Sequence, residues 1–287
     1  MKKVIIDFGA NEGQNINYYL SKADIVVCVE PNPKLVKMIR KKFPKPIHSK
    51  KLFIENVAVI EDSSKTEVDF YIHKRKNQLS SVIEPRQKDN FFFVKVKAKS
   101  ITEILEKYLT KKTLLYYTKF DLEGFDAIVI SAMFKAGFFP LNLSTEVSTS
   151  KSLEAIFHSG KYNGYKLQEG STVSQYLSLP VKTKNGIAAT KFMEHSAGPM
   201  GEDIPSPWLT ERSIRNKLKI EGFGWKDIHA TMPSNCDPVD IKHSELFMAG
   251  MKQAHRLMYR ALLPYTLRNH PKFRKVLSAS LHLIKKP

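Results

Sequence analysis

Apolar and polar positions along the first half of the chain follow the pattern of an α/β protein. Short apolar runs bounded by turn residues predict buried strands. They alternate with stretches in which apolar residues recur every three or four positions, as helices require. This alternation predicts a doubly wound parallel sheet with helices on both faces. We expect strands near 3–8, 25–30, 52–60, 66–72, 91–98, 114–120 and 141–147, and helices from about residue 14 and at 33–43, 100–109 and 126–136.

After residue 158 the alternation stops. Residues 160–208 are rich in Gly, Ser, Pro and Thr, which is typical of a lid, a binding loop or a linker. Helical periodicity returns later, where apolar residues line one side of a helix that Pro264 ends. That side comprises Phe247, Met251, Ala254, Met258, Ala261 and Leu262. Short strands are expected near 163–168 and 175–181, and helices at 210–220, 241–263 and 271–284.

These patterns divide the chain into three parts, and 287 residues suffice to bury a large core. Residues 1–157 form the expected core. Residues 158–208 would supply the final strands and a loop or lid that binds a substrate. Residues 209–287 would form a basic, helical C-terminal extension.

Composition narrows the class of protein. No apolar run approaches the roughly 20 residues that a membrane-spanning helix needs. The opening MKK leads directly into the first strand, without the pattern of a cleaved leader. The two cysteines, Cys28 and Cys236, do not suggest a disulfide framework. We therefore expect a cytoplasmic protein.

The net charge of +18 is unevenly distributed. Residues 251–287 hold nine Lys or Arg and no acidic residue, and so supply half of the excess. Lys252, Arg256 and Arg260 recur every four residues and form a basic stripe. This tail could seat the protein on the surface of an anionic membrane, or meet an acidic partner such as a glycan or a nucleic acid. Alternatively, the stripe is the solvated face of a helix packed on the core.

The first strand leads into a glycine turn that is typical of a nucleoside-binding site. Residues 4–13 read VIIDFGANEG, and the next apolar run ends in Glu30. Gly9 would allow the backbone to approach a ligand closely, and Gly13 would allow the following helix to pack near the strand. An acid at the end of the second strand can accept hydrogen bonds from both hydroxyls of a ribose. The alternative is an ordinary turn whose glycines serve geometry alone.

The acid in this turn indicates which kind of ligand it suits. The pattern is DxGxNxG rather than GxGxxG, with Asp7 at the tip of the strand and Asn11 in the turn. A carboxylate would repel a pyrophosphate, but it attracts a ligand that carries positive charge. The ammonium and sulfonium groups of S-adenosylmethionine meet that requirement.

A second cluster of acids, TKFDLEGFD at 118–126, ends the apolar run LLYY. It therefore belongs at the carboxyl end of a strand, where doubly wound sheets bind their ligands. Acids favour the start of a helix, which accounts for Asp126 well and for Glu123 in part. Asp121 still lies on the strand, so we expect a ligand or a catalytic role to compensate its charge.

Four stretches together resemble the FkbM-type methyltransferases. They are VIIDFGANEGQN, VVCVEPNP, NVAVIEDSS at 56–64 and KFDLEGFDAIVI at 119–130, so the resemblance covers roughly residues 3–150. This family consists of O-methyltransferases of the Rossmann-like class that use S-adenosylmethionine. Many of its relatives look like sugar or glycan methyltransferases. The resemblance implies a methyltransferase sheet and methyl transfer to a hydroxyl of a sugar, a glycan or a related small molecule.

The resemblance also assigns roles to individual residues. Glu30 would bind the ribose, and Asn56 and Ala58 would border the adenine. Asp121 and Glu123 would face the methionine moiety or the acceptor. Asp126 departs from the family pattern, in which a Glu is commoner at this position. The cofactor loop would comprise Asp7, Gly9, Ala10, Asn11 and Gly13.

Methyl transfer to a sugar hydroxyl benefits from a general base, which typically adds 10²- to 10⁴-fold to the rate. The candidates are Asp121, Glu123 and His195. The reaction requires no metal ion, although Asp121 with Glu123, or Glu202 with Asp203, could bind a divalent cation.

Two segments are candidates for selecting the acceptor: the loop at 74–90, and residues 195–208, which mix polar side chains with Trp208. The second segment could instead be a structural loop that braces the C-terminal helices.

Two other functions stay open. The first is methylation of RNA or another nucleic acid, which the net charge suggests, although the basic excess is concentrated in the tail. The second is a non-catalytic module that keeps the fold to bind a partner. The sequence does not predict an oligomeric state.

Overall fold

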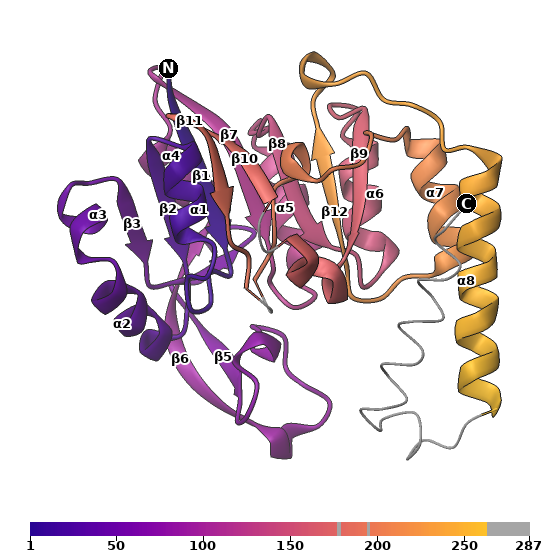
Figure 1. Cartoon of the computed structure of the whole chain (residues 1–287). Coiled ribbons are helices and arrows are strands. Elements are labelled where there is room, and N and C mark those ends of the chain that lie inside the picture. The colour runs from indigo at the N-terminus through magenta and orange to yellow at the C-terminus, as the bar shows by residue number, and fades with distance from the viewer. Residues whose placement is uncertain (177–178, 194–195, 263–287) are drawn as a thin grey trace.

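The protein is built around a seven-stranded, mostly parallel sheet (Figure 1). The computed structural model describes residues 1–287 except 177–178, 194–195 and 263–287. The strand order is β3-β2-β1-β7-β8-β12-β9, and only β12 runs antiparallel to its neighbours. The strands are β1 (Lys2–Phe8), β2 (Ile25–Val29), β3 (Leu52–Glu55), β7 (Thr113–Phe120), β8 (Asn142–Glu146), β9 (Gly164–Glu169) and β12 (Lys226–Thr231). The expected α/β class with a parallel core is confirmed.

The order of the strands reverses beside β1. From β1 the chain builds outward through β2 to β3, and it then crosses to the other side of β1 to form β7 and β8. Asp7 on β1 pairs with Lys119 on β7 in the parallel register, so the two strands end at the same level. In open sheets of this kind, ligands bind in the crevice outside the carboxyl ends of the strands at such a reversal.

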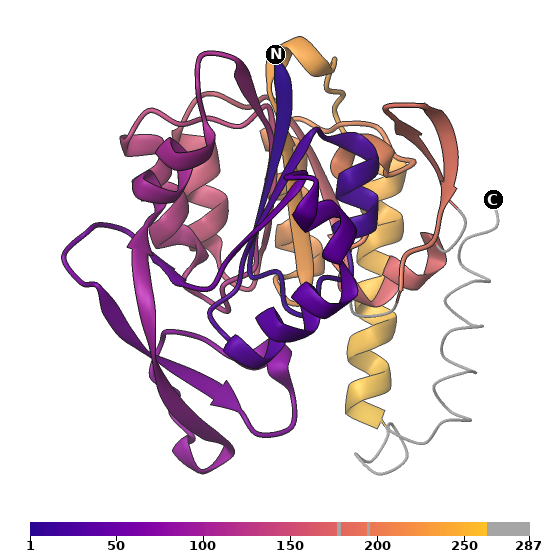
Figure 2. The ribbon, with the colours of Figure 1, turned by 90° about the vertical axis from the view of Figure 1, so that its left-hand side faces the viewer.

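Helices cover both faces of the sheet, as the view in Figure 2 shows. Side chains of Val4, Ile6 and Phe8 pack with α4 (Ile101–Tyr108), α5 (Asp126–Lys135), α6 (Ser150–His158) and α7 (Glu211–Glu221). Ile5 points to the opposite face, because side chains alternate along a strand. There it packs with α1 (Ile16–Lys22) and α2 (Pro33–Lys42), which a short helix, α3 (Pro44–His48), follows.

Local sequence accounts for where two of these helices begin. The side chain of Asn32 accepts a hydrogen bond from the Lys34 amide, and Pro33 occupies the first turn of α2, as predicted. At α4, Ser100 and Glu103 form a reciprocal capping box. Both helices therefore begin within a residue or two of the predicted positions.

A small three-stranded sheet projects below the carboxyl edge of the main sheet (Figure 1). It consists of β4 (Ala58–Ile60), β5 (Glu67–His73) and β6 (Phe91–Ser100) in the order β4-β6-β5. The single strand predicted at 52–60 is therefore wrong: its first half belongs to the main sheet and its second half to the small one. We call residues 58–100 the small lobe.

The second half of the chain contains one core strand that the hydrophobic pattern did not predict. β12 lies between β8 and β9, so the part expected to be a helical extension from residue 209 contributes a strand to the main sheet. Its sequence, KDIHAT, alternates polar and apolar residues and contains no apolar run. The described residues between 170 and 204 cover one face of the sheet and include the hairpin of β10 (Leu179–Thr183) and β11 (Gly186–Thr190).

The last described helix, α8 (His243–Leu262), packs beside α7. Its predicted apolar side differs from expectation, because Phe247 is 67% exposed and Met251 is also exposed. Ala249 is buried instead. The helix predicted at 271–284 lies outside the described residues, as do the side chains of Arg256, Met258 and Arg260. None of the described helices is long and apolar enough to cross a bilayer.

Candidate functional site

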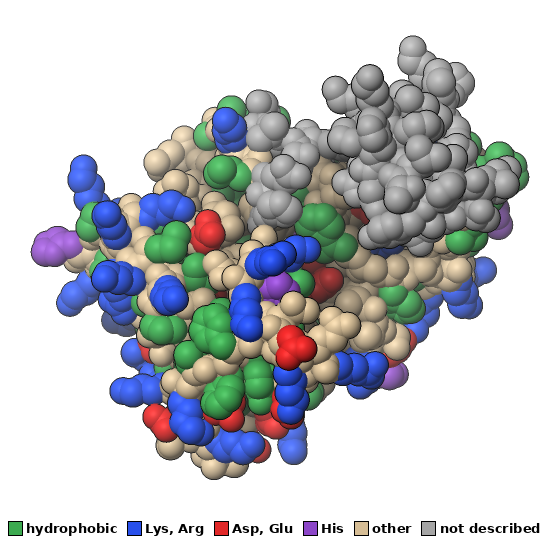
Figure 3. Space-filling model, turned by 90° about the horizontal axis from the view of Figure 1, so that it is seen from below, with side chains coloured by type: hydrophobic (Ala, Val, Ile, Leu, Met, Phe, Trp, Pro, Cys, Tyr) green, Lys and Arg blue, Asp and Glu red, His purple; other side chains and the backbone are tan. Residues whose placement is uncertain are grey.

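A pocket of about 570 Å³ opens at the carboxyl edge of the sheet. It lies at the reversal of strand order, because residues at the carboxyl ends of β1, β2, β7 and β8 all line it. The small lobe contributes residues 76–82, and β12 contributes Asp227. Figure 3 views this side of the molecule from below, where acidic side chains are visible in a hollow among Lys and Arg.

Gly9 makes the closest approach in the site. Its φ of +85° belongs to the left-handed region, and a β-carbon built there would lie 2.0 Å from the backbone oxygen of Asp121. The glycine therefore allows the two motifs to pack against each other, rather than serving a ligand alone as expected. A β-carbon on Gly13 would lie 2.7 Å from Ile16, so this glycine allows close packing with α1.

Glu30 is buried at the end of β2 and faces the pocket. Its carboxylate accepts hydrogen bonds from the backbone amides of Asn11 (2.8 Å) and Asn32 (2.9 Å). Burial raises the pKa of Glu30 to about 7, despite these two donors. Each carboxylate oxygen keeps a lone pair for a further donor.

Asn56 and Ala58 make different contacts: Ala58 faces the pocket, whereas the Asn56 side chain bonds to the backbone. Ala58 lines the pocket, together with Val57 and Val59. The Asn56 amide instead donates to the backbone oxygens of Glu30 (2.9 Å) and Pro31 (3.0 Å). Asn56 therefore holds the turn that carries Glu30.

Lys119 joins the two acidic motifs, a role that the sequence analysis missed. Its Nζ lies 3.1 Å from Asp121 and 3.5 Å from Asp7, and it donates to the Gly9 backbone oxygen at 3.3 Å. Burial raises the pKa of Asp7, and the nearby ammonium group of Lys119 opposes that shift. Part of the charge on Asp121 is thus compensated within the protein, not only by a ligand.

Asp126 positions the loop that carries Glu123. Its carboxylate accepts hydrogen bonds from the backbone amides of Leu122 (2.9 Å) and Gly124 (3.1 Å). Glu123 itself has a φ of +51°. From the small lobe, the Ser81 hydroxyl donates to the backbone oxygens of Leu122 and Glu123. The loop is therefore held from both sides.

Two acids that the sequence analysis missed complete the pocket. Asp227 on β12 pairs in register with Glu146 on β8, and both line the pocket with Glu123. Among the described residues, no hydrogen bond or ion pair reaches these three carboxyl groups. Burial, followed by the nearby Asp121, raises the pKa of Glu123 to about 8 and the pKa values of Glu146 and Asp227 to about 7.

One set of carboxylates has the spacing of a cation site. Oxygen atoms of Asp121, Glu123 and Glu146 all lie within 4.8 Å of one another. The predicted pair of Asp121 with Glu123 thus gains a third carboxylate from β8. Carboxylates at such spacing are common without a bound ion.

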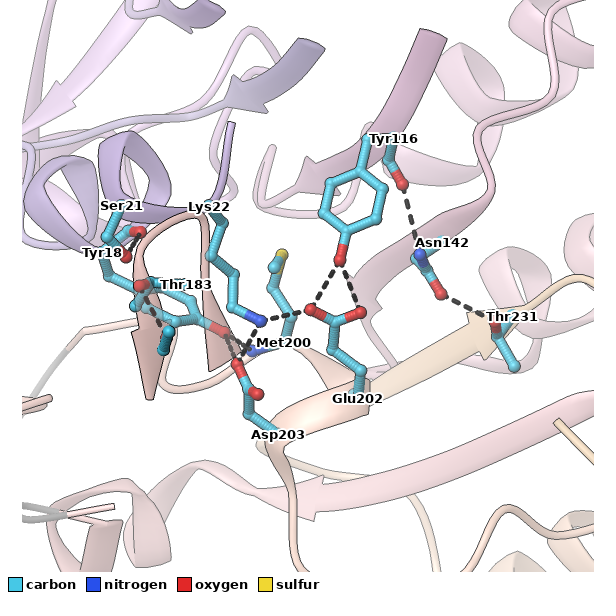
Figure 4. Close-up of polar contacts among 12 residues, drawn as sticks. Tyr18, Ser21, Lys22, Tyr116, Asn142, Thr183, Met200, Glu202, Asp203 and Thr231 are labelled. Carbon is cyan, nitrogen blue, oxygen red and sulfur yellow. Dashed lines mark hydrogen bonds and ion pairs between the residues drawn. The ribbon is translucent and has the colours of Figure 1, made fainter. Parts of the chain in front are cut away.

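Residues 196–208, the described part of the second candidate segment, are attached to the body of the protein by a polar network (Figure 4). Glu202 pairs with Lys22 and accepts a hydrogen bond from the Tyr116 hydroxyl at 2.5 Å. Asp203 pairs with Lys22 (2.6 Å) and accepts a hydrogen bond from Tyr18 (2.6 Å). The carboxylates of Glu202 and Asp203, the second pair predicted to be able to bind a divalent cation, therefore already have lysine and tyrosine partners.

This network changes the interpretation of the segment. It braces α1 and β7 rather than the C-terminal helices, and neither Glu202 nor Trp208 lines the pocket. Of the described residues in this segment, only Ser196 and Ala197 do so. His195 lies outside the described residues.

Comparison with models of known protein families gives no match for this chain. A search of curated proteins likewise finds no match.

Proposed function

We propose that this protein is an S-adenosylmethionine-dependent O-methyltransferase that acts on a hydroxyl group of a sugar, a glycan or a related acceptor. One observation carries the proposal. Glu30, at the end of β2, and Asp121, at the end of β7, line a single pocket at the reversal of strand order. The resemblance of these two motifs to the FkbM type agrees with that position.

The residues present fit the cofactor. The Oδ1 atom of Asn11 is buried and has no hydrogen-bond partner among the described residues, and Oδ1 of Asp7 has only the Lys119 ammonium group, at 3.5 Å. Buried polar atoms without a hydrogen bond are costly, so these two favour a ligand that donates hydrogen bonds. Glu30 would accept from the ribose hydroxyls, and the apolar side chains of Val57 and Ala58 would border the adenine.

Charge in the pocket favours a neutral or positively charged acceptor. Two lysines, Lys76 and Lys119, line the pocket against six acids: Asp7, Glu30, Asp121, Glu123, Glu146 and Asp227. The pocket thus has an excess of acidic side chains, whereas the chain as a whole has a net charge of +18. The pKa values of four of these acids are raised to about 7 or 8, so their repulsion of phosphate groups grows as the pH rises through that range, whereas hydroxyl groups can donate hydrogen bonds to their carboxylates. A nucleic acid is therefore the less suitable acceptor.

Glu123 is the candidate general base with the best environment. Its pKa of about 8 lies near physiological pH, where proton transfer is most effective. When bound, S-adenosylmethionine supplies a methyl group on a positively charged sulfur. Glu123 would accept the hydroxyl proton of the acceptor, whose oxygen takes the methyl group. Asp126 and Ser81 hold its loop in place.

Transfer of a labelled methyl group to neutral oligosaccharides, with single-stranded RNA as the competing acceptor, tests this proposal. We expect label in the oligosaccharide and a loss of roughly 10²- to 10⁴-fold in turnover for Glu123→Gln. Glu84→Gln is the matched control, since Glu84 pairs with Lys88 on the surface and does not line the pocket. Label in RNA alone, or wild-type turnover in Glu123→Gln, would contradict the assignment.

A further inference from the structure

Exposed apolar side chains gather at the mouth of the pocket. Leu79 and Trp225 line the pocket, yet Leu79 is exposed and Trp225 is 54% exposed. Ile83, also exposed, lies near Gly124, where a β-carbon would be 3.5 Å from its Cδ1 atom. Soluble proteins seldom leave large apolar residues grouped beside a binding site unless that surface meets a partner.

The free end of the small lobe continues this surface. Phe92 is exposed and Phe93 is 59% exposed near the start of β6. As neighbours on a strand they point to opposite faces, so both faces of the lobe carry an aromatic ring at this end. Phe223, two residues before Trp225, is exposed as well. In Figure 3, hydrophobic side chains are interspersed with Lys and Arg on this side of the molecule.

Trp225 is held in place by the residue beneath it. A β-carbon on Gly170 would lie 2.3 Å from the indole ring, so the ring rests directly on the backbone of this glycine. A fixed and half-exposed indole is suited to the boundary between water and an apolar phase, because one end of the ring is apolar and the other can remain hydrated.

Basic residues accompany the apolar ones. The loop at 74–90 contains five Lys or Arg against two acids. Lys76 lines the pocket, and the Nζ of Lys34 lies 6.0 Å from the centre of the Phe92 ring. We call this combination the mouth surface; its apolar members are Leu79, Ile83, Phe92, Phe93, Phe223 and Trp225.

We infer that the mouth surface docks on an anionic lipid bilayer, so that the pocket opens toward a headgroup at the membrane. Aromatic and aliphatic side chains mixed with lysines are the composition of interfacial membrane-binding surfaces. Four of the six apolar members carry a ring on which a base could stack, but the aliphatic Leu79 and Ile83 do not, and aliphatic side chains suit the apolar interior of a bilayer. These features favour a bilayer over RNA.

This inference names the source of the acceptor: a neutral or amine-bearing sugar headgroup that a lipid carries to the pocket. That the headgroup is methylated rests on the proposed function, whereas docking of the mouth surface on a bilayer does not. Failure of one can therefore be recognised without failure of the other.

Co-sedimentation of the full chain with vesicles of equimolar phosphatidylserine and phosphatidylcholine tests the docking. The double variant Phe93→Ser with Phe223→Ser removes two exposed rings, neither of which lines the pocket. We expect vesicle affinity to fall by roughly tenfold or more, from the loss of two partly buried rings. Ile187→Ser is the control, because Ile187 is 81% exposed on β11, outside the mouth surface, and should leave affinity unchanged.

The other outcomes overturn the inference. Vesicle binding that the double variant retains would show that other charges, such as the basic tail, attract the bilayer. Absence of vesicle binding, with retention on single-stranded RNA that the double variant loses, would assign the surface to a nucleic acid. Calorimetry with S-adenosylmethionine on the same proteins, which we expect the variants to leave unchanged, reports separately on the proposed function.

Discussion

The α-carbon of Gly9 packs against the backbone carbonyl of Asp121, leaving no space for a side chain. The amide of Asp121 in turn donates to the Phe8 carbonyl at 3.0 Å. Two motifs more than a hundred residues apart in the sequence are therefore interlocked through their backbones. Placement of the acids of one motif depends on the glycine turn of the other.

Gly9→Ala should lower the free energy of unfolding of the protein. The new β-carbon would collide with the Asp121 oxygen, in addition to the cost of a positive φ, which is roughly 1–2 kcal/mol for a residue with a side chain. Gly137→Ala is a matched control, since Gly137 has a φ of +83° and no atom within 4 Å of a built β-carbon. Urea denaturation should show a clearly larger loss of unfolding free energy for Gly9→Ala. Equal losses would mean that the contact with Asp121 is easily relieved.

Glu30→Gln should weaken the binding of S-adenosylmethionine by about 10- to 100-fold, because a hydrogen bond to a charged acceptor is worth roughly 1.5–3 kcal/mol. Wild-type affinity should also rise with pH through about 7, as Glu30 loses its proton. Glu55→Gln is the control, since Glu55 lies at the end of the neighbouring strand β3 but pairs with Lys99 and Lys107 outside the pocket. Calorimetry at pH 6 and pH 8 measures both effects. An affinity that is independent of pH and of Glu30 would remove this residue from the site.

Lys119→Met should destabilise the fold by about 3–5 kcal/mol, because removal of the ammonium group leaves the buried carboxylate of Asp7 without compensation. The pKa of Asp7, already raised by burial, should rise further without the ammonium group. A group with a raised pKa in the folded state costs stability as the pH rises, so the loss should be larger at pH 8 than at pH 5. The second substitution Asp7→Asn should restore part of it. A loss that does not vary with pH would argue against this account of Lys119.

Asp227→Asn should stabilise the protein at alkaline pH. The pKa of Asp227 is raised to about 7 in the folded state, so the cost of its ionisation to folding grows as the pH rises from the ordinary pKa of an aspartate to about 7, and it is fully present above that pH. At pH 8 the free energy of unfolding of the variant should therefore exceed that of the wild type by roughly 1–3 kcal/mol, and at pH 4 the two free energies should be similar. Asp62→Asn should bring no such gain, because the Ser64 hydrogen bonds lower the pKa of Asp62. Thermal unfolding of the wild type and both variants between pH 4 and pH 8 measures these differences in stability.

Much of the core could be predicted because its local signals agree. β1, β2 and β7 are apolar runs followed by turn residues, and α2 and α4 combine helical periodicity with recognisable ends. The prediction that the acids at 118–126 lie at the carboxyl edge, near the glycine turn, also follows from alternation alone. In the structure these two motifs line the same pocket.

The rest depends on packing between distant segments. β12 has a polar and alternating sequence, and nothing local indicates that it lies between β8 and β9. Asp227 and Glu146 therefore could not be placed in the pocket from the sequence. Lys119 lies in the predicted strand, but its position between Asp7 and Asp121 depends on the register of β1 with β7. The same limit applies to Glu202 and Asp203, whose partners lie on α1 and β7.

Calorimetric titration of the full chain with S-adenosylmethionine tests the central claim most directly. We predict saturable binding that Glu30→Ala abolishes and that Asp62→Asn, a change on the surface, leaves intact. The demethylated product should compete for the same site. Absence of binding, or binding that Glu30→Ala does not change, would contradict the assignment of this pocket to the methyl donor.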